Sequence, residues 1–425
     1  MDTPAEDGAN PVYTLEGFDD VTVNKTLLGT LVNNGNGLTS TALIEENCTD
    51  LAKFGLAEPK VTVEYTYESG GTAKFYVGNN APTNSGVYVM AEGNNTVYTV
   101  SLSSMSNFTN TTKDFIEKTV LEAPENQEDY PKINKLTIER DDLDSNIVLE
   151  YDKSSEDKYS GGTSSTHIMT EPVECNLSGD ASETVLTGMF GLYANDVYAV
   201  HCKESDIAGA GLNEPFCRVT MDCEDRDDYV LLLSEVFTDD DGDKCCYGMF
   251  EGGKVIYIIS EENAVWLKTT PIDIISKMMV SSYVWNITDF KVSGNNGASA
   301  DFKIKPIDSS KPMSESKTED FEVKKDGEIF DSERYRQFYA FLISGSLEEF
   351  ALGKPVPDGE PMASVEYTDS YSKKTYKYDF YDDSLMQALI TVNGESKFYC
   401  SKAFVNTLID NIKRIDTGED YVKTW

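Results

Sequence analysis

Histidine is the side chain most often used for acid–base and metal chemistry near neutral pH, and the chain has two, His167 and His201. His167 lies in GGTSSTHIMT, a stretch rich in Ser, Thr and Gly, so we expect it in a solvent-exposed loop. His201 ends the predicted strand VYAVHC and is followed by Cys202. Consecutive strand residues point to opposite faces, whereas a Cys–His nucleophile needs its side chains to converge. We therefore interpret His201 as a packed or edge histidine and not as half of a catalytic pair.

Sequence motifs of the common catalytic sites are absent: the chain has no G-x-S-x-G elbow, no P-loop and no H-E-x-x-H zinc motif. The 74 acidic residues allow many carboxylate pairs of the glycosidase type, so no pair is singled out. A hydrolase needs polar groups that converge in one pocket, and spacing along the chain predicts no such group. We expect a protein that is not an enzyme, with no catalytic residue and no cofactor; a hydrolase is the weakest alternative.

The acidic segment TDDDGDK, at residues 238–244, has some features of a calcium loop. An EF-hand loop has Gly at position 6 and ligands at positions that include 1 and 12. If Gly242 takes position 6, positions 1 and 12 fall on Phe and Gly, which offer no side-chain oxygen. A solvated turn is the simplest interpretation. The alternative is weak Ca²⁺ binding through the aspartates Asp239, Asp241 and Asp243.

The net charge of the chain is −38, from 74 acidic and 36 basic residues. Such a chain repels phosphate backbones and anionic lipid surfaces, so we expect no nucleic-acid partner. No run of about 18 apolar residues is present, so the chain itself is not expected to span a membrane. The start, MDTPAEDGANPVY, is polar and acidic, unlike a signal peptide. It is either a cytosolic start or the sequence after a removed signal or membrane anchor. We favour the second, because the first repeat looks shortened.

Two related pentapeptides, GLAEP at residues 55–59 and GLNEP at residues 211–215, precede stretches in which apolar and polar residues alternate. Alternation with period two predicts a half-buried strand. Proline cannot continue a helix and biases the preceding residue toward extended backbone. Each pentapeptide is therefore predicted to form a corner between a short helix and a strand, and a weaker third copy begins at EPMASVEYTDS. The corner residues are Gly55, Leu56, Pro59, Gly211, Leu212, Pro215 and Pro361.

The repeat extends beyond the corner. GVYVMAEGNNTVYTVS, from Gly86, aligns without a gap with CCYGMFEGGKVIYIIS, from Cys245, and both predict a hairpin. A leading hairpin, INKLTIER with IVLEYDK, corresponds to ITDFKVSG with ADFKIKP, and the first copy lacks it. Each copy then runs into a predicted helix, most clearly SKAFVNTLIDNIKRI. We predict an α+β protein of three tandem repeats of antiparallel meander plus helices, at residues 11–125 (shortened at its front), 126–280 and 281–425.

The eight cysteines are interpreted through this repeat. An even count invites a disulfide framework. Cys217 and Cys223, however, take apolar positions of the alternating strand, where the first copy has Val61 and Tyr67. We interpret them as small core residues, with a bridge or metal site as the alternative. No C-x-x-C spacing occurs, so we expect no metal site of the zinc type.

Tyrosines crowd the first and last predicted meanders. In the first meander they are Tyr65, Tyr67, Tyr76, Tyr88 and Tyr98, and in the last Tyr367, Tyr371, Tyr376, Tyr378 and Tyr381. An exposed aromatic strand face can stack on sugars or hold a protein partner. The alternative is ordinary sheet and core packing, because tyrosine favours strands.

FGLAEPKVTVEY, followed by FYVGN and GVYVMAEGNNTVYTV, resembles the domain-of-unknown-function family 4340, best over residues 51–116. The second copy has Leu-Ser-Glu in place of Val77-Gly78-Asn79, and the third lacks the Gly-Leu of the corner. The resemblance implies an extracytoplasmic envelope location behind an N-terminal membrane anchor. It also implies an association, for some relatives, with gliding-type ABC transporter components. It provides no catalytic residues.

Two functional hypotheses follow. The first is a non-enzymatic envelope protein, a scaffold or accessory subunit of a membrane complex such as an ABC transporter, with a protein partner. The second is a glycan- or peptide-binding module that uses an aromatic sheet face or a cleft between modules.

Overall fold

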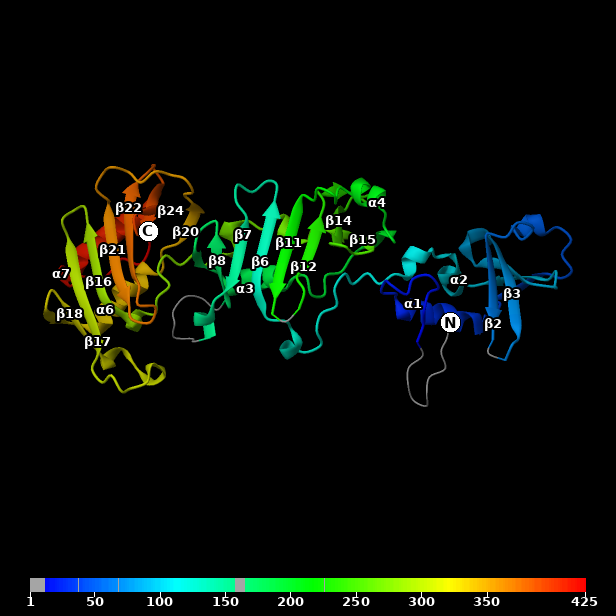
Figure 1. Cartoon of the computed structure of the whole chain (residues 1–425), viewed down its shortest axis with the longest axis horizontal. Helices are drawn as coiled ribbons and strands as arrows, with labels where there is room; N and C mark the ends of the chain where they lie inside the picture. The colour runs from blue at the N-terminus through cyan, green and yellow to red at the C-terminus, as the bar shows by residue number, and fades with distance from the viewer. Residues whose placement is uncertain (1–11, 37, 68, 157–164, 225) are drawn as a thin grey trace. The chain divides into compact units, whose positions relative to one another are not determined.

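The computed structural model describes residues 12–36, 38–67, 69–156, 165–224 and 226–425 (Figure 1). Helices and mostly antiparallel strands form three sheets, which confirms the predicted α+β class. Among the described residues, no helix is both long enough and apolar enough to cross a membrane.

The described α-helices are α1 (Lys25–Asn36), α2 (Leu102–Thr109), α3 (Gly179–Thr187), α4 (Glu204–Gly209), α5 (Pro271–Ile274), α6 (Ser332–Leu342) and α7 (Lys402–Thr417). Two short 3-10 helices also matter, η1 (Leu51–Phe54) and η6 (Val265–Leu267). Helix α6 begins at Asp331, whose carboxylate accepts hydrogen bonds from the amides of Glu333 and Arg334 at 2.8 and 3.0 Å. This N-cap satisfies two amides that have no partner within the helix.

The strands of the first sheet are β1 (Ala42–Glu45), β2 (Val61–Thr66), β3 (Thr72–Asn80), β4 (Val87–Ala91) and β5 (Val97–Val100). Those of the second are β6 (Ile133–Arg140), β7 (Ile147–Tyr151), β8 (His167–Glu171), β9 (Cys175–Asn176), β10 (Asp196–Val200), β11 (Cys217–Cys223), β12 (Tyr229–Leu233), β13 (Phe237–Thr238), β14 (Lys244–Phe250) and β15 (Val255–Ser260). Those of the third are β16 (Ile287–Gly294), β17 (Ser299–Pro306), β18 (Phe321–Lys325), β19 (Glu328–Phe330), β20 (Leu347–Phe350), β21 (Ala363–Asp369), β22 (Thr375–Asp382), β23 (Gln387–Val392) and β24 (Glu395–Ser401).

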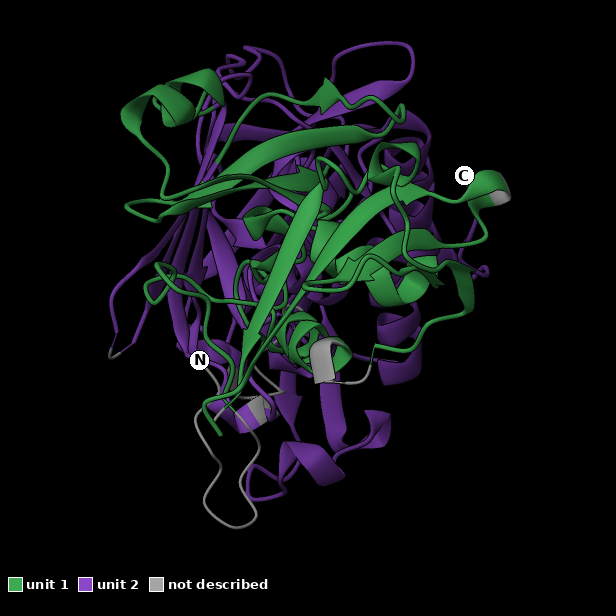
Figure 2. Ribbon diagram, turned by 90° about the vertical axis from the view of Figure 1, so that its right-hand side faces the viewer, with its two compact units in different colours: residues 1–123, 191–215, 233–263 green, residues 124–190, 216–232, 264–425 purple. Residues whose placement is uncertain are grey.

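The chain forms two compact units, shown in Figure 2: unit 1 comprises residues 1–123, 191–215 and 233–263, and unit 2 comprises residues 124–190, 216–232 and 264–425. Unit 1 holds the first sheet, in the order β1-β5-β4-β3-β2, and strands β10, β13, β14 and β15 of the second. Unit 2 holds the run β12-β11-β6-β7-β8-β9 and the third sheet, in the order β19-β18-β17-β16-β21-β22-β23-β24-β20. The predicted number of repeats and their boundaries stay predictions.

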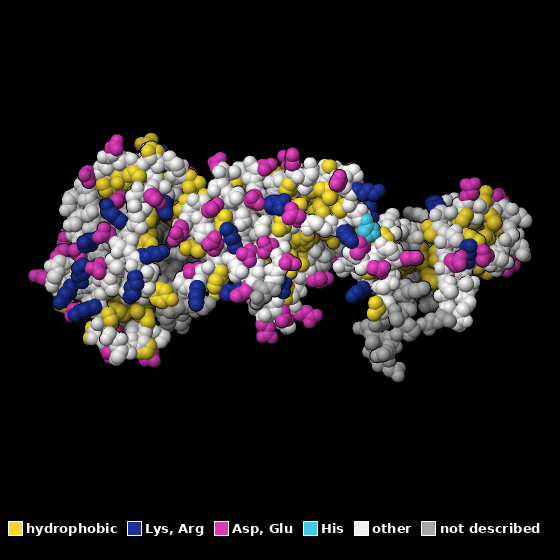
Figure 3. Space-filling model, in the orientation of Figure 1, with side chains coloured by type: hydrophobic (Ala, Val, Ile, Leu, Met, Phe, Trp, Pro, Cys, Tyr) yellow, Lys and Arg dark blue, Asp and Glu magenta, His cyan; other side chains and the backbone are white. Residues whose placement is uncertain are grey.

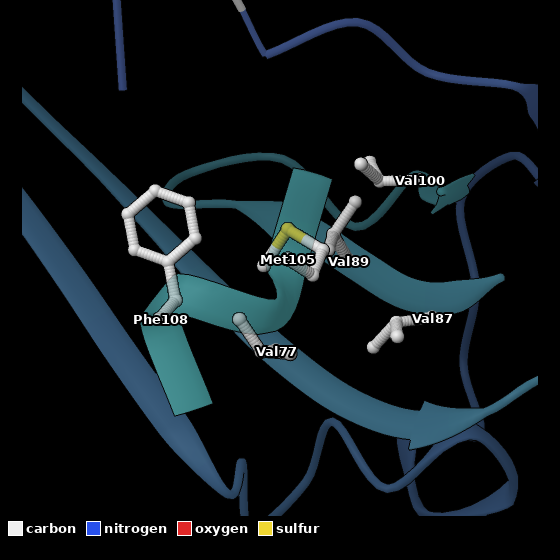
Figure 4. Packing of buried hydrophobic residues seen from close by; sticks show 6 residues of the cluster. All are labelled: Val77, Val87, Val89, Val100, Met105 and Phe108. Carbon is white, nitrogen blue, oxygen red and sulfur yellow. The ribbon is translucent and has the colours of Figure 1, made fainter. Parts of the chain in front are cut away.

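One core of unit 1 lies between the first sheet and helix α2. Figure 4 shows side chains of β3, β4, β5 and α2 turned toward one another. The buried members are Val77, Val87, Val89, Val100, Met105 and Phe108. The alternation predicted from the sequence places these valines on one face of the sheet.

The core of the third sheet is aromatic. Phe290 on β16 is fully buried and contacts the rings of Tyr335, Phe338 and Tyr339 on α6, with ring centroids 5.8, 6.1 and 6.5 Å away. Helix α7 packs on the same sheet through its buried apolar face. Helix α7, which the sequence predicted, and helix α6 therefore both cover the third sheet.

The segment after the β4–β5 hairpin and the segment after the β14–β15 hairpin contain the same hydrogen bonds, one in unit 1 and the other in unit 2. In unit 1, the amide and hydroxyl of Thr111 donate to Asp114 at 2.6 and 2.9 Å. In unit 2, the amide of Thr270 donates to Asp273 at 3.0 Å, and its hydroxyl bonds the same carboxylate. Five residues further on, Thr119 forms a β-bridge with Tyr193, and Met278 forms one with Ser346. A closing segment thus ends one predicted repeat and pairs with the chain of the next.

Candidate functional site

The two GL-x-EP corners are confirmed as helix-to-strand connections, although glycine and not proline ends each helix. In the third copy no helix lies between β20 and β21 among the described residues, so Pro361 follows a loop. Gly55, after η1, has φ 69° and Gly211, after α4, has φ 71°, the left-handed conformation that ends helices. Leu56 and Leu212 are buried at 3% and 2% exposure. Strands β2 and β11 start two residues after the prolines Pro59 and Pro215, and β21 starts two residues after Pro361. These residues shape the backbone where each strand begins.

Four of the five tyrosines of the first meander lie on two faces of the sheet. Their strand register places Tyr65 and Tyr98 on the face of the α2 core, whereas Tyr67 follows the end of β2 and is 38% exposed. Tyr76 and Tyr88 lie on the opposite face, against Leu51 and Phe54 of η1. Burial raises the pKa of Tyr65 to about 12, and its hydroxyl donates to the carbonyl of Leu31 at 3.2 Å. The structure therefore does not bring all five together as one aromatic face.

The aspartates of the acidic segment organise a turn. One carboxylate oxygen of Asp239 accepts hydrogen bonds from the amides of Asp241 and Asp243 at 3.1 and 2.8 Å. Its other oxygen lies 3.7 Å from the sulfur of Cys245. Among the described residues, no group of three or more His, Cys, Asp or Glu side chains is arranged to hold a metal ion. The Asp239 carboxylate is thus occupied with its own backbone.

Cysteine packing follows the prediction for Cys217 and Cys223, which are buried at 0% and 4% exposure. All eight cysteines are described, and all are free thiols. Burial raises the pKa of Cys217 to about 12. Such a thiol does not ionise near neutral pH, so it is a core residue and a poor nucleophile.

His201 and Cys202 have separate partners. The ring of His201 lies 2.9 Å from an oxygen of Asp20 and packs on Phe18 with ring centroids 5.0 Å apart. The sulfur of Cys202 lies 3.7 Å from the carbonyl oxygen of Gly253. Hydrogen bonds from Lys254 and His201 lower the pKa of Asp20 to about 2. The pair is therefore not a nucleophile and its base, and His201 is the edge histidine that the sequence predicted.

The prediction that His167 is solvent-exposed is wrong, because this residue begins strand β8 and is only 7% exposed. Its Nε2 lies 3.0 Å from the carbonyl oxygen of Ile133, which can only accept, so Nε2 carries the proton. Nδ1 then accepts from the Thr166 hydroxyl at 2.8 Å. Burial lowers the pKa of His167 below its usual value. The Ser-, Thr- and Gly-rich sequence before His167 led to the wrong prediction.

This neutral histidine predicts a pH dependence of stability. The unfolded chain takes up a proton below about pH 6.5, whereas the folded chain resists it, so stability falls as the pH drops from there toward the lower pKa of the folded state. All three tryptophans, Trp266, Trp285 and Trp425, lie in unit 2. Urea unfolding followed by their emission should show this loss between about pH 6.5 and 5.5. His167→Gln should flatten the slope, and His201→Gln, in unit 1, should leave it unchanged. An equal slope in His167→Gln would contradict the assignment.

His167 lines a polar hollow of about 420 Å³ within unit 2. The hollow is bounded by residues of β7, β8 and β9 and by the connection between β21 and β22. Its walls carry three tyrosines, Tyr151, Tyr371 and Tyr376, and four carboxylates, Glu150, Asp152, Glu174 and Asp369. The sequence singled out Tyr371 and Tyr376 as members of the tyrosine-rich last meander, but it gave no sign that they meet the second predicted module.

Hydrogen bonds fix the walls of the hollow. The buried Asp369 carboxylate accepts from the amides of Tyr371 and Ser372 at 2.7 and 2.9 Å, which shapes the turn that carries Tyr371. Asn176 donates to the Ser281 hydroxyl at 2.6 Å across the floor. An exposed ion pair of 3.8 Å joins Lys374 to Glu174 at the rim. The turn of β21–β22 and the end of β8–β9 are thus held in place without filling the space between them.

A second hollow of about 320 Å³ shares six wall residues with the first. Its other walls are more apolar and include Met279, Tyr367, Tyr378 and Phe398. Together the two hollows combine aromatic rings, hydroxyls and amides, a mixture typical of sites for polar ligands with apolar faces. In the first hollow, four carboxylates face one lysine and His167 is neutral, a balance that favours a neutral or cationic ligand over an anion. Elsewhere, acidic side chains are scattered over the face in Figure 3 with Lys and Arg between them.

Comparison with known families gives one match. The model of the domain of unknown function DUF4340 matches residues 14–215. The predicted resemblance is therefore confirmed. The DUF4340 match extends on both sides of the segment that carried the resemblance and includes both GL-x-EP corners. No curated protein and no solved structure matches the chain.

Proposed function

We propose that the chain is a non-enzymatic binding protein and that the polar hollow of unit 2 binds a glycan. The observation that carries this proposal is the meeting of Tyr151, Tyr371 and Tyr376 with carboxylate, amide and hydroxyl groups around about 420 Å³. Sugar rings stack their apolar faces on aromatic rings and direct their hydroxyls to carboxylates and amides. Pockets of about 300–1,000 Å³ are typical of sites for small ligands.

Two polar groups of the hollow support a non-enzymatic role, because their hydrogen-bonding positions are already used. His167 is neutral, and both ring nitrogens are used for hydrogen bonds. Asp369 is occupied by the backbone of its own turn. A general acid or base needs a free position that reaches the ligand. The ring of Tyr371, which is 41% exposed, offers a contact surface for a ligand.

Calorimetric titration of a panel of neutral and amino-sugar oligosaccharides against the full chain tests the glycan site. We expect at least one member of the panel to bind, and Tyr371→Ala to weaken that binding about tenfold, a loss of about 1.4 kcal/mol. Tyr193→Ala, which removes a ring that is 53% exposed in unit 1, is the matched control and should bind unchanged. Equal weakening in both variants, or no binding by any sugar, would rule out the glycan proposal.

A second candidate is the accessory role in a membrane complex of the cell envelope that the DUF4340 resemblance implies. It requires an extracytoplasmic location, a membrane anchor outside the described residues, and a protein partner. The structural feature that favours a protein partner is the open edge of the first sheet at β2. Crosslinking of the full-length protein in cells tests this role, and recovery of transporter subunits is the expected result. Recovery of cell-wall polymer alone would favour the glycan proposal instead.

A further inference from the structure

The first sheet ends at strand β2, whereas the corresponding strands of the other two sheets continue to a further strand. Strand β11 pairs antiparallel with β6, and β21 pairs antiparallel with β16. Strand β2 pairs only with β3 among the described strands (Figure 1). The Glu-Pro pair that precedes each strand places β2, β11 and β21 in register, so Val63 corresponds to Val219 and to Val365.

The backbone groups that face this open edge can be identified. The amide of Tyr67 donates to the carbonyl of Gly71 at 2.8 Å, which fixes the odd-numbered residues of β2 as those bonded to β3. The even-numbered residues, Thr62, Glu64 and Thr66, therefore direct their N–H and C=O groups away from the sheet. All three side chains are exposed. In β21, Glu366 is the residue at the position of Glu64.

The same reasoning shows that the equivalent groups are used in unit 2. The amide of Asn295 donates to the carbonyl of Met362 at 2.8 Å, next to the β16–β21 ladder. Alternation then makes Ser364, Glu366 and Thr368 the residues of β21 that bond to β16. The open groups of β2 are thus the counterparts of groups that pair with a neighbouring strand in the third sheet.

Charge on the neighbouring strands distinguishes the two glutamates. Glu366 lies 3.9 Å from Lys291 of β16 and opposite Lys377 of β22. Glu64 lies 3.6 Å from Lys74 of β3, the position that Lys377 takes in unit 2. Its other side, where a counterpart of Lys291 would lie, is open, and its side chain is 58% exposed. The edge therefore favours a basic residue opposite Glu64.

Apolar positions on both sides of this basic residue follow from the register. In the third sheet, Phe290 and Val292 lie opposite Tyr367 and Val365. In the second sheet, Leu136 and Ile138 lie opposite Met221 and Val219. Both edges therefore accept the pattern apolar–polar–apolar, which is Phe-Lys-Val in β16 and Leu-Thr-Ile in β6. Val63 and Tyr65, half-buried on β2, offer the matching apolar surface.

We propose that a partner protein of the chain adds an antiparallel strand to β2, with an apolar–basic–apolar triplet opposite Tyr65, Glu64 and Val63. Strand addition at an exposed edge gains affinity from main-chain hydrogen bonds and specificity from alternate side chains. A second copy of this chain is disfavoured in the register centred on Glu64, because an antiparallel β2–β2 pair would place two carboxylates opposite each other there. The inference names the partner segment for the accessory role above and rests on that role.

The experiment uses the full chain and a fluorescent peptide with the sequence ITDFKVSG, that of residues 287–294. We expect the peptide to bind and the amides of Thr62, Glu64 and Thr66 to gain protection from hydrogen exchange. Glu64→Lys should weaken binding at least tenfold, and the peptide with Glu in place of its Lys should restore it. Glu92→Lys is the matched control, because Glu92 also pairs with Lys74, at 3.7 Å, but does not lie on β2.

A backbone test leaves the protein unchanged. N-methylation of the peptide at its Lys removes an N–H that faces β2 in this register and should abolish binding, whereas N-methylation at the adjacent Val should leave it intact. Equal effects of the two methyl groups, no binding at about 1 mM peptide, or a response to Glu92→Lys equal to that of Glu64→Lys would overturn the proposal. Protection of the β2 amides in the free chain with a concentration-dependent dimer would overturn it in favour of self-pairing. If the peptide does not bind, strand addition is ruled out, and the crosslinking experiment still tests the accessory role separately.

Discussion

Replacement of Arg140 by alanine is expected to destabilise unit 2 by about 3 kcal/mol. Arg140 ends β6 with its side chain only 3% exposed. One guanidinium nitrogen donates to the carbonyls of Trp266 and Thr269 at 2.7 and 2.9 Å, and two others bond to Asp142. Alanine leaves both buried carbonyls without this donor, and an unsatisfied buried polar group costs about 1–3 kcal/mol.

The comparison with the third sheet explains why an arginine is needed there. In the corresponding place on β16 is Gly294, and an added Cβ would lie 3.2 Å from Ile409 of the long helix α7. In the second sheet, the segment after the hairpin has only two short helices, η6 and α5. Arg140 thus holds this irregular segment in place by donating to its carbonyls. In the third sheet, helix α7 occupies the corresponding segment and its carbonyls are bonded within the helix.

Urea unfolding followed by tryptophan emission measures the effect of Arg140→Ala, because Trp266 lies at the site. Arg140→Lys should lose less, because an ammonium can still donate to the same carbonyls. Arg336→Ala is the surface control: its ion pair with Glu333 is almost half exposed, and we expect a change within about 0.5 kcal/mol. A loss in Arg140→Ala no larger than in the control would show that the carbonyls find other partners.

Local patterns predicted most of the secondary structure. The alternation in VTVEYT and the proline of the corner act within a few residues, so β2, β11 and β21 start close to where the sequence placed them. The helix predicted at SKAFVNTLIDNIKRI is confirmed as α7 for the same reason. The end of the short helix was harder to predict, because both Gly55, with its left-handed backbone, and Pro59 can end a helix.

The environment of His167 and the polar hollow depend on contacts that are distant in sequence. His167 is buried because its ring reaches Ile133 on β6, 34 residues away. The hollow joins Glu150 to Lys374, and no pattern in either segment refers to the other. The tyrosine content of the last meander was the one available signal, and composition alone did not separate Tyr371, at the hollow, from Tyr367 in the core.

Substitution of Gly78 by alanine is expected to destabilise the first sheet by about 3 kcal/mol, at the upper end for overpacking. Gly78 lies on β3 beneath the corner, where an added Cβ would come within 2.2 Å of the Phe54 carbonyl oxygen and 3.1 Å of Leu56. The oxygen belongs to the backbone, so η1 must move away from the sheet. This contact joins the Gly-Leu corner to the Val-Gly-Asn segment, the two parts of the motif by which DUF4340 was recognised.

In the second copy of the motif, Ser234 takes the place of Gly78, which provides the matched control. An added Cβ at Gly211 would lie 4.0 Å from the Ser234 Cβ, so this corner has room for a side chain. Ser234→Ala should therefore cost less than Gly78→Ala, mainly the hydrogen bond of 2.9 Å from the Tyr247 amide, about 1 kcal/mol. Hydrogen exchange of the β3 and β4 amides measures the loss in unit 1, while tryptophan emission, which reports on unit 2, should not change. Full protection of β3 in Gly78→Ala would mean that the corner can move without cost, and the packing explanation of the motif would be wrong.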